Sequence, residues 1–266
     1  MRHLRNPSPR LPDAVTFGQR LQAYCVHVYT ASGVAFAFLA AAETCAPHPD
    51  PRWVFVWLSV AALIDATDGP LARRWHVKSR APRINGRVID DIVDYLTFTF
   101  IPLLLVWRLQ WLSPPAGLWV SLAMMASLFG FANTRVKQEH EGFFLGFPSY
   151  WNVYAFYTGL WFTHHGPLMP TIVLGLLTVL TMLPVRFVYP NLVSQPWRGL
   201  LIITAFGWLA VLLISLPGYP AVPSWLGWVS LSYPGLYIGV SAYLDVTARL
   251  QQRRLADRLP RQQEPP

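Results

Sequence analysis

The chain has 266 residues, of which 53% are hydrophobic and only 13% are charged, and its formal net charge is +8. One or two soluble domains would fit this length, but long runs almost free of charge recur along the sequence, which is typical of a polytopic helical membrane protein. Membrane topology and contact with anionic lipids then explain the excess of basic residues, which argues against a nucleic-acid-binding protein.

The apolar runs predict an all-α integral membrane protein with about eight transmembrane helices. The predicted spans are residues 24–42, 53–75, 86–112, 116–133, 149–162, 168–188, 197–216 and 225–246. Residues 1–19 are expected to form a cytoplasmic tail, residues 20–248 the membrane domain, and residues 249–266 a basic, disordered tail.

Basic residues between the predicted spans give the orientation. Nearly all Lys and Arg residues fall in the two tails or in connectors on the same side as the tails, whereas Arg52 and Arg108 lie on the other side. Both termini are therefore predicted to be cytoplasmic. Cys25 and Cys45 lie at opposite ends of the first span, about 30 Å apart along a helix, which excludes a disulfide between them.

The segment from Asp65 to Asp94 places acidic residues beside apolar runs, a costly arrangement that suggests a function. Asp65 and Asp68 share one face of the second predicted helix, and Asp90 and Asp94 form a stripe on the third. Asp91 lies about 100° around that helix and is expected to point elsewhere. Because the two helices are antiparallel and joined at their cytoplasmic ends, the four carboxylates of the two faces are expected to converge near the cytoplasmic boundary.

Four converging carboxylates in a medium of low dielectric constant need compensating positive charge. Their hard oxygen atoms suit Mg²⁺ or Mn²⁺ rather than zinc or copper. Gly69, Ala72 and Gly86 are small residues that leave room for a ligand near the backbone, and Arg73 could neutralise phosphate charge. The alternative interpretation is that the aspartates only pair with the surrounding arginines at the interface.

The ordered pattern D-x-x-D-G-x-x-A-R followed by G-x-x-x-D-x-x-x-D resembles the signature of the CDP-alcohol phosphotransferase family. Every position of that signature is present, from Asp65 to Asp94. The gap between Arg73 and Gly86, residues 74–85, is longer than in most members of the family. This longer gap and the stretches at residues 142–152 and 186–190 are similar to the bacterial phosphatidylcholine synthase branch of the family.

The resemblance implies transfer of a phosphatidyl group from CDP-diacylglycerol to choline, with release of CMP, on the cytoplasmic side of a bacterial inner membrane. It implies that Asp94 is the general base that takes the proton of the acceptor hydroxyl. It also implies two Mn²⁺ or Mg²⁺ ions, and a homodimer is a further expectation. The implied metal ligands are Asp65, Asp68, Asp90 and Asp94, and the implied CDP-binding residues are Gly69, Ala72, Arg73 and Gly86.

An acceptor with a quaternary ammonium group cannot donate a conventional N–H hydrogen bond, and proteins bind such groups with aromatic faces. Tyr95, Tyr150, Trp151 and Tyr154 are therefore candidate choline-binding residues, with Glu141 as a candidate counter-charge. The alternative for each ring is a place in the aromatic belt at the membrane interface.

The sequence leaves two alternative functions. A sibling phosphotransferase that uses serine, inositol or glycerol phosphate would have the same core chemistry, but a phosphorylated acceptor would favour extra Lys or Arg near Asp94. The aromatic residues at 147–154 favour choline instead. A cation transporter would spread its acidic residues across the membrane depth, often on broken or repeated helices, whereas here they cluster at one end of one helix pair.

Overall fold

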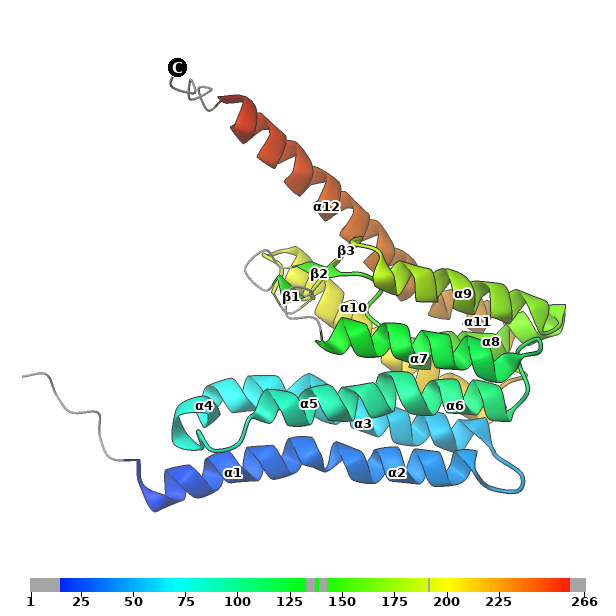
Figure 1. The fold of residues 1–266 in the computed structure, drawn as a ribbon, viewed down its shortest axis with the longest axis horizontal. Helices are drawn as coiled ribbons and strands as arrows, with labels where there is room; N and C mark the ends of the chain where they lie inside the picture. Colours follow the sequence, from blue (N-terminus) through cyan, green and yellow to red (C-terminus); the bar gives the residue numbers. More distant parts are fainter. Residues whose placement is uncertain (1–14, 133–136, 139–142, 191, 259–266) are drawn as a thin grey trace, which may run out of the picture.

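The computed structural model describes residues 15–132, 137–138, 143–190 and 192–258, which form a bundle of helices with one small sheet (Figure 1). In the first half of the chain the elements are α1 (Phe17–Ala31), α2 (Gly33–Thr44), α3 (Pro51–Arg74), α4 (Val77–Arg80), α5 (Gly86–Asp94), the π-helix η1 (Tyr95–Phe100), α6 (Ile101–Arg108) and α7 (Ala116–Ala132). In the second half they are β1 (Lys137–Gln138), β2 (Phe143–Leu145), α8 (Trp151–Leu160), the 3₁₀-helices η3 (Phe162–His165) and η4 (Leu216–Gly218), α9 (Leu168–Met182), β3 (Arg186–Val188), α10 (Trp197–Ser215), α11 (Ser224–Ser230) and α12 (Ser232–Arg258).

Helices α1 and α2 run end to end along α3 and α5 (Figure 1). The junction between α1 and α2 packs closely against α5, because a Cβ atom added to Gly33 would lie 2.6 Å from Cγ1 of Val93. The hydroxyls of Tyr29 on α1 and Thr67 on α3 lie 2.7 Å apart. These contacts fix α1, α3 and α5 as one unit, and this unit carries the acidic segment.

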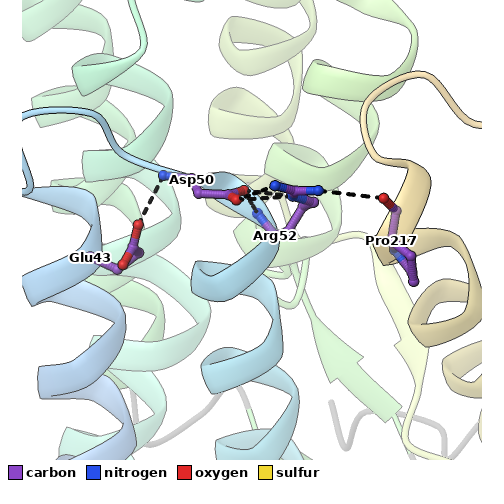
Figure 2. Close-up of polar contacts among 4 residues, drawn as sticks. All are labelled: Glu43, Asp50, Arg52 and Pro217. Carbon is purple, nitrogen blue, oxygen red and sulfur yellow. Dashed lines mark hydrogen bonds and ion pairs between the residues drawn. The ribbon is translucent and has the colours of Figure 1, made fainter.

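Helix α3 begins at a well-defined cap (Figure 2). The carboxylate of Asp50 accepts a hydrogen bond of 2.9 Å from the backbone N–H of Arg52, and Pro51 occupies the first turn, where its missing N–H costs nothing. The Arg52 guanidinium also forms an ion pair with Asp50, at 2.6 Å between Nη2 and Oδ2. The other end of α3 contains Pro70, whose ring removes the donor for the Ala66 carbonyl one turn earlier.

The third predicted span is a continuous helical run from Gly86 to Arg108, but its middle is a π-helix. Pro102 follows this segment and cannot donate to the Phe98 carbonyl, which accounts for a change of hydrogen-bonding pattern just before it. Single π-helical turns often lie at functional sites. This one begins directly after Asp94.

The main core lies where α2, α3, α6, α7 and α8 meet, and Trp151 is fully buried in it. A second core lies between the sheet, α10 and α12, and it contains Phe187, Val188 and Tyr237. Arg186 on β3 and Asp245 on α12 lie 3.9 Å apart and join the sheet to that helix.

Three helical runs of the described residues are long and apolar enough to cross a membrane, namely Phe17–Thr44, Pro51–Arg74 and Trp197–Gly218. Ala116–Ala132 and Leu168–Met182 are shorter apolar helices. Large apolar side chains point outward on these helices, and Ile203 on α10 is 74% exposed. A contiguous apolar exterior of this kind suits lipid rather than water. The prediction of a mainly helical membrane protein is confirmed.

The sequence predicted no strand, and here the structure differs. Strands β1, β2 and β3 form an antiparallel sheet in that order, with Phe144 opposite Phe187. The predicted span at residues 168–188 ends as a helix at Met182, and its last residues form β3. Pro184 cannot continue the helical hydrogen bonds, and the aromatic and β-branched residues Phe187 and Val188 suit a strand. Helix α12 continues through Arg258, so the first part of the predicted C-terminal tail is helical.

Candidate active site

Three of the four predicted acidic ligands come together in the structure. Asp65 and Asp68 of α3 and Asp90 of α5 each offer a carboxylate oxygen, and these oxygens lie within 4.8 Å of one another. Asp68 is buried, and the other two are half-buried. The spacing of the residues along two antiparallel helices predicted that these three would meet, whereas the fourth predicted member, Asp94, is not in the group.

The neighbours of Asp68 explain how a buried carboxylate is accommodated. It lies within hydrogen-bonding reach of the Thr30 hydroxyl of α1 and of the Gly69 backbone N–H. The Arg73 guanidinium, farther along α3, also interacts electrostatically with Asp68. Helix α1 thus supplies part of the shell that orients the acidic cluster.

Asp94 follows Asp90 on the same stripe of α5 and is half-buried, but it is not one of the three residues of the acidic cluster. It is the last residue of α5 and directly precedes the π-helix. Asp91 points toward Arg87 instead, at 4.0 Å between Nε and Oδ2. The predicted separation of Asp91 from the other carboxylates is confirmed.

The acidic cluster fits a divalent cation of the magnesium type. Mg²⁺ takes oxygen ligands at about 2.0–2.1 Å, so opposite ligands lie roughly 4 Å apart. Carboxylate oxygens within 4.8 Å of one another need only small side-chain rotations to reach that spacing. The donors are all carboxylate oxygens, which suit Mg²⁺ or Mn²⁺ rather than zinc or copper.

The small residues of the signature have different surroundings. A Cβ atom added to Gly69 would lie 3.4 Å from Nη1 of Arg73, and one added to Gly86 would lie 2.8 Å from Cε1 of His27. Ala72 packs beside the core shared by α1 and α4. Gly86 is therefore required by the close approach of a buried histidine on α1, a packing reason that the sequence did not indicate.

A cavity of about 1000 Å³ is bounded by α3, α8, α9, α10 and the start of α12. Ala66, the neighbour of Asp65 in the sequence, lines this cavity, but none of the three aspartates of the acidic cluster does. Its lining follows α3 from Phe55 to Arg73, which is about 27 Å along the helix axis. The lining is mostly apolar, and Arg73 and Arg198 are its basic residues among those described. Such a cavity suits a ligand with a long apolar part and an anionic group at one end.

The predicted aromatic residues separate into two groups. Tyr150 lines the cavity, and its ring centroid lies 6.2 Å from that of Phe98. The polar groups of the other candidates serve the packing of helices: Trp151 Nε1 donates to Ser127 Oγ at 2.6 Å, Tyr154 Oη donates to the Pro170 carbonyl at 2.8 Å, and Tyr95 Oη donates to the Met124 carbonyl at 3.2 Å. Tyr154 nevertheless also lines the cavity. Glu141 lies outside the described residues.

Sequence reasoning missed three cavity tyrosines, Tyr157 on α8 and the pair Tyr233 and Tyr237, which enters from α12. It also counted Arg198 only as a topology signal. The i, i+4 spacing of the two tyrosines places them on one helix face. No pattern in the sequence predicts that this face of α12 packs against residues more than a hundred positions earlier. Only the fold brings the two tyrosines to the site.

The chain belongs to the CDP-alcohol phosphatidyltransferase family, whose model matches residues 11–233. The acidic cluster and most of the cavity lie within that matched region.

Several relatives are named phosphatidylcholine synthase. The chain is 40% identical to one from Bradyrhizobium diazoefficiens over 64% of this chain and 62% of that protein, so this match covers less than two thirds of the relative's own length. It is 36% identical to one from Pseudomonas aeruginosa over 71% of this chain and 78% of that protein. It is 34% identical to one from Legionella pneumophila over 86% and 90%, respectively.

Proposed function

We propose that this chain transfers the phosphatidyl group of CDP-diacylglycerol to choline and releases CMP, the reaction of a phosphatidylcholine synthase. The observation that carries the proposal is the convergence of Asp65, Asp68 and Asp90 in a member of this family, with two of the three on α3, a helix that also lines a long apolar cavity. The names of the relatives support choline as the acceptor.

The proposal includes the membrane arrangement. The chain would cross a bacterial inner membrane about eight times, with both termini and the acidic cluster on the cytoplasmic side. Residues 20–248 would form the catalytic domain, between the tails at residues 1–19 and 249–266. The distribution of Lys and Arg supports this orientation. A homodimer is part of the same proposal, and mass measurement of the detergent-solubilised protein would test it.

Asp65, Asp68, Asp90 and Asp94 would hold two Mn²⁺ or Mg²⁺ ions. Bound there, the ions would offset the charge of the diphosphate and favour departure of CMP. The aspartates would hold the ions on α3 and α5, two helices that α1 contacts.

Four residues would bind the CDP part of the donor. Arg73 lines the cavity at the end of α3, where its guanidinium can reach phosphate oxygens. Gly69 and Ala72 would keep large side chains out of the way of the nucleotide, and Gly86, which packs against His27, would contribute its backbone. The apolar length of the cavity would receive donor acyl chain.

Asp94 would act as the general base. It would take the hydroxyl proton of choline as that oxygen bonds to the β-phosphorus, the one that carries diacylglycerol. The bond from this phosphorus to the oxygen bridging it to CMP breaks, and CMP leaves with the electron pair. The position of Asp94 one turn beyond Asp90 supports this role, because the base must lie next to the bound diphosphate.

Tyr95, Tyr150, Trp151 and Tyr154 remain the proposed aromatic surroundings of choline, together with Glu141. Among them, the cavity position of Tyr150 gives it the strongest support for direct contact. The hydrogen bonds of the other three rings suit residues that hold the walls of the site.

The purified protein tests the proposal when it is assayed with CDP-diacylglycerol and labelled choline, with and without Mn²⁺. We expect metal-dependent formation of phosphatidylcholine and an equal amount of CMP. Product with serine, inositol or glycerol 3-phosphate but not with choline would make the chain a sibling phosphotransferase. Transport of a cation by proteoliposomes without CMP release would favour the transporter alternative.

A further inference from the structure

Three tyrosines from distant parts of the chain meet in the cavity, and we call Tyr150, Tyr233 and Tyr237 the tyrosine cluster. All three line the cavity. The ring centroid of Tyr237 lies 6.4 Å from that of Tyr150, at 65°, and 6.4 Å from that of Tyr233, at 31°. The rings thus come from the start of α8 on one side and from α12 on the other.

The tyrosine cluster lies next to the acidic cluster. Asp65 interacts electrostatically with the phenol of Tyr150. Phe98 follows Asp94 by one turn of the third helical run, and its ring centroid lies 6.2 Å from that of Tyr150. Phe98 therefore links the helical run that carries Asp94 to the tyrosine cluster.

Both basic side chains and tyrosine rings line the cavity. Arg73 and Arg198 line it and suit the phosphates of the donor. The tyrosine cluster instead offers aromatic faces, with Asp65 as the nearby negative charge. Aromatic faces with a carboxylate close by are the surroundings that stabilise a quaternary ammonium ion.

We propose that Tyr150, Tyr233 and Tyr237 bind the trimethylammonium group of choline, so that α12 supplies the acceptor site. This proposal rests on the proposed function and assigns the acceptor to residues of that same cavity. Two carbon atoms separate the nitrogen of choline from its hydroxyl oxygen. For the proposed reaction, a cation held by the tyrosine cluster would have to direct its hydroxyl toward the stripe that carries Asp94.

The structure also fixes the orientation of the rings. Tyr237 Oη donates to the Val188 carbonyl of β3 at 3.0 Å, and its ring stacks on that of Phe187 with centroids 6.3 Å apart and an angle of 11°. Trp208 of α10 lies against Tyr233, with centroids 5.4 Å apart. The small sheet and α10 thus hold the rings of the tyrosine cluster in place. Orienting these rings is the structural role that we assign to the strands.

Tyr233 is the best position for a test, because it is half-buried and lies at the edge of the second core. The proposal predicts that Tyr233→Leu raises the KM for choline about tenfold, whereas Tyr233→Phe, which keeps an aromatic face, stays within about threefold of the wild type. The KM for CDP-diacylglycerol should not change in either variant. Tyr243→Leu, on the same helix but exposed and outside the cavity lining, is the matched control and should behave like the wild type.

A neutral analogue separates binding of the cation from general packing. In 3,3-dimethylbutan-1-ol a carbon atom replaces the nitrogen of choline, so the shape is kept and the charge is lost. The wild type should prefer choline over this alcohol in kcat/KM, and Tyr233→Leu should lose about tenfold of that preference. Tetramethylammonium should compete with choline, and about tenfold less well in Tyr233→Leu.

The outcomes distinguish this proposal from the proposed function. If the wild type makes no phosphatidylcholine, the proposed function fails. If the wild type makes it and Tyr233→Leu keeps both the KM and the preference for choline, the tyrosine cluster is not the acceptor site. A rise in the KM for CDP-diacylglycerol alone would assign these rings to the acyl chains of the donor and would also overturn the proposal.

Discussion

The two ends of α3 both carry aspartates, and they use them in opposite ways. At the start of α3, the partners of Asp50 are close by in the sequence (Figure 2). The backbone and the side chain of Arg52 donate to the Asp50 carboxylate, and the backbone N–H of Asp50 donates to the Glu43 carboxylate at 2.9 Å. Arg52 also reaches the Pro217 carbonyl at 3.5 Å. Near the other end, Asp65 and Asp68 instead converge with a third carboxylate from another helix.

The difference shows how a structural aspartate is told from a functional one. Asp50 caps a helix and pairs with a cation two residues away, so its charge is offset locally. The acidic cluster brings negative charges together, which raises the free energy of the folded protein in the absence of a cation. The Arg73 guanidinium interacts with Asp68, and the proposed metal ions would supply further positive charge.

Asp94→Asn should have the largest effect. The substitution keeps the size of the side chain and removes the base, so turnover should fall about 10²–10⁴-fold. Binding of CDP-diacylglycerol, measured by equilibrium titration of the purified protein, should be retained. A variant that turns over at the wild-type rate would remove Asp94 from the mechanism.

Asp90→Asn should have a large effect through the metal. Loss of one carboxylate from the acidic cluster should raise the Mn²⁺ concentration needed for half-maximal activity about 10–100-fold, a range typical of residues that support a metal site. Asp91→Asn is the matched control, because Asp91 points to Arg87 on the same helix. Equal effects of the two substitutions would show that the acidic cluster has no special role in metal binding.

Asp50→Ala should have the smallest effect, and on stability rather than on chemistry. Loss of the cap should lower the free energy of unfolding by about 1 kcal/mol, while the KM values for both substrates stay unchanged. Thermal unfolding in detergent and the choline assay would measure the two quantities. A loss of activity without a loss of stability would contradict the contrast between the two ends of α3.

The stability of the protein should depend slightly on pH through Asp50. The hydrogen bond from the Arg52 side chain holds the pKa of Asp50 below its usual range. Its stabilising contribution is therefore complete above about pH 4 and is lost as the pH falls through the lowered pKa. The difference in thermal stability between the wild type and Asp50→Asn should shrink below about pH 4. A difference that grows toward low pH would contradict the ion pair.

Local spacing predicted what lies on one helix or on two consecutive ones. The different orientation of Asp91, about 100° around the helix from Asp90, followed from the same geometry.

Helical spacing could not predict contacts between elements that are far apart in the sequence. The contact of Gly86 with His27 depends on α1 lying against α5, and the tyrosine cluster depends on α12 lying against the start of α8. The strand at residues 186–188 belongs to an apolar run that was predicted as one helix. Its helical part ends at Met182, before Pro184. In each case the deciding partner is far away in the sequence, where periodicity carries no information.

Choline labelled with ¹⁸O in its hydroxyl group tests the central claim most directly. If the choline oxygen attacks the β-phosphorus of CDP-diacylglycerol, the purified protein should form phosphatidylcholine that keeps the ¹⁸O, together with one CMP for each lipid made. Mass spectrometry of the product and of the released nucleotide measures both. Absence of a choline lipid, or a choline lipid without the label, would contradict the account.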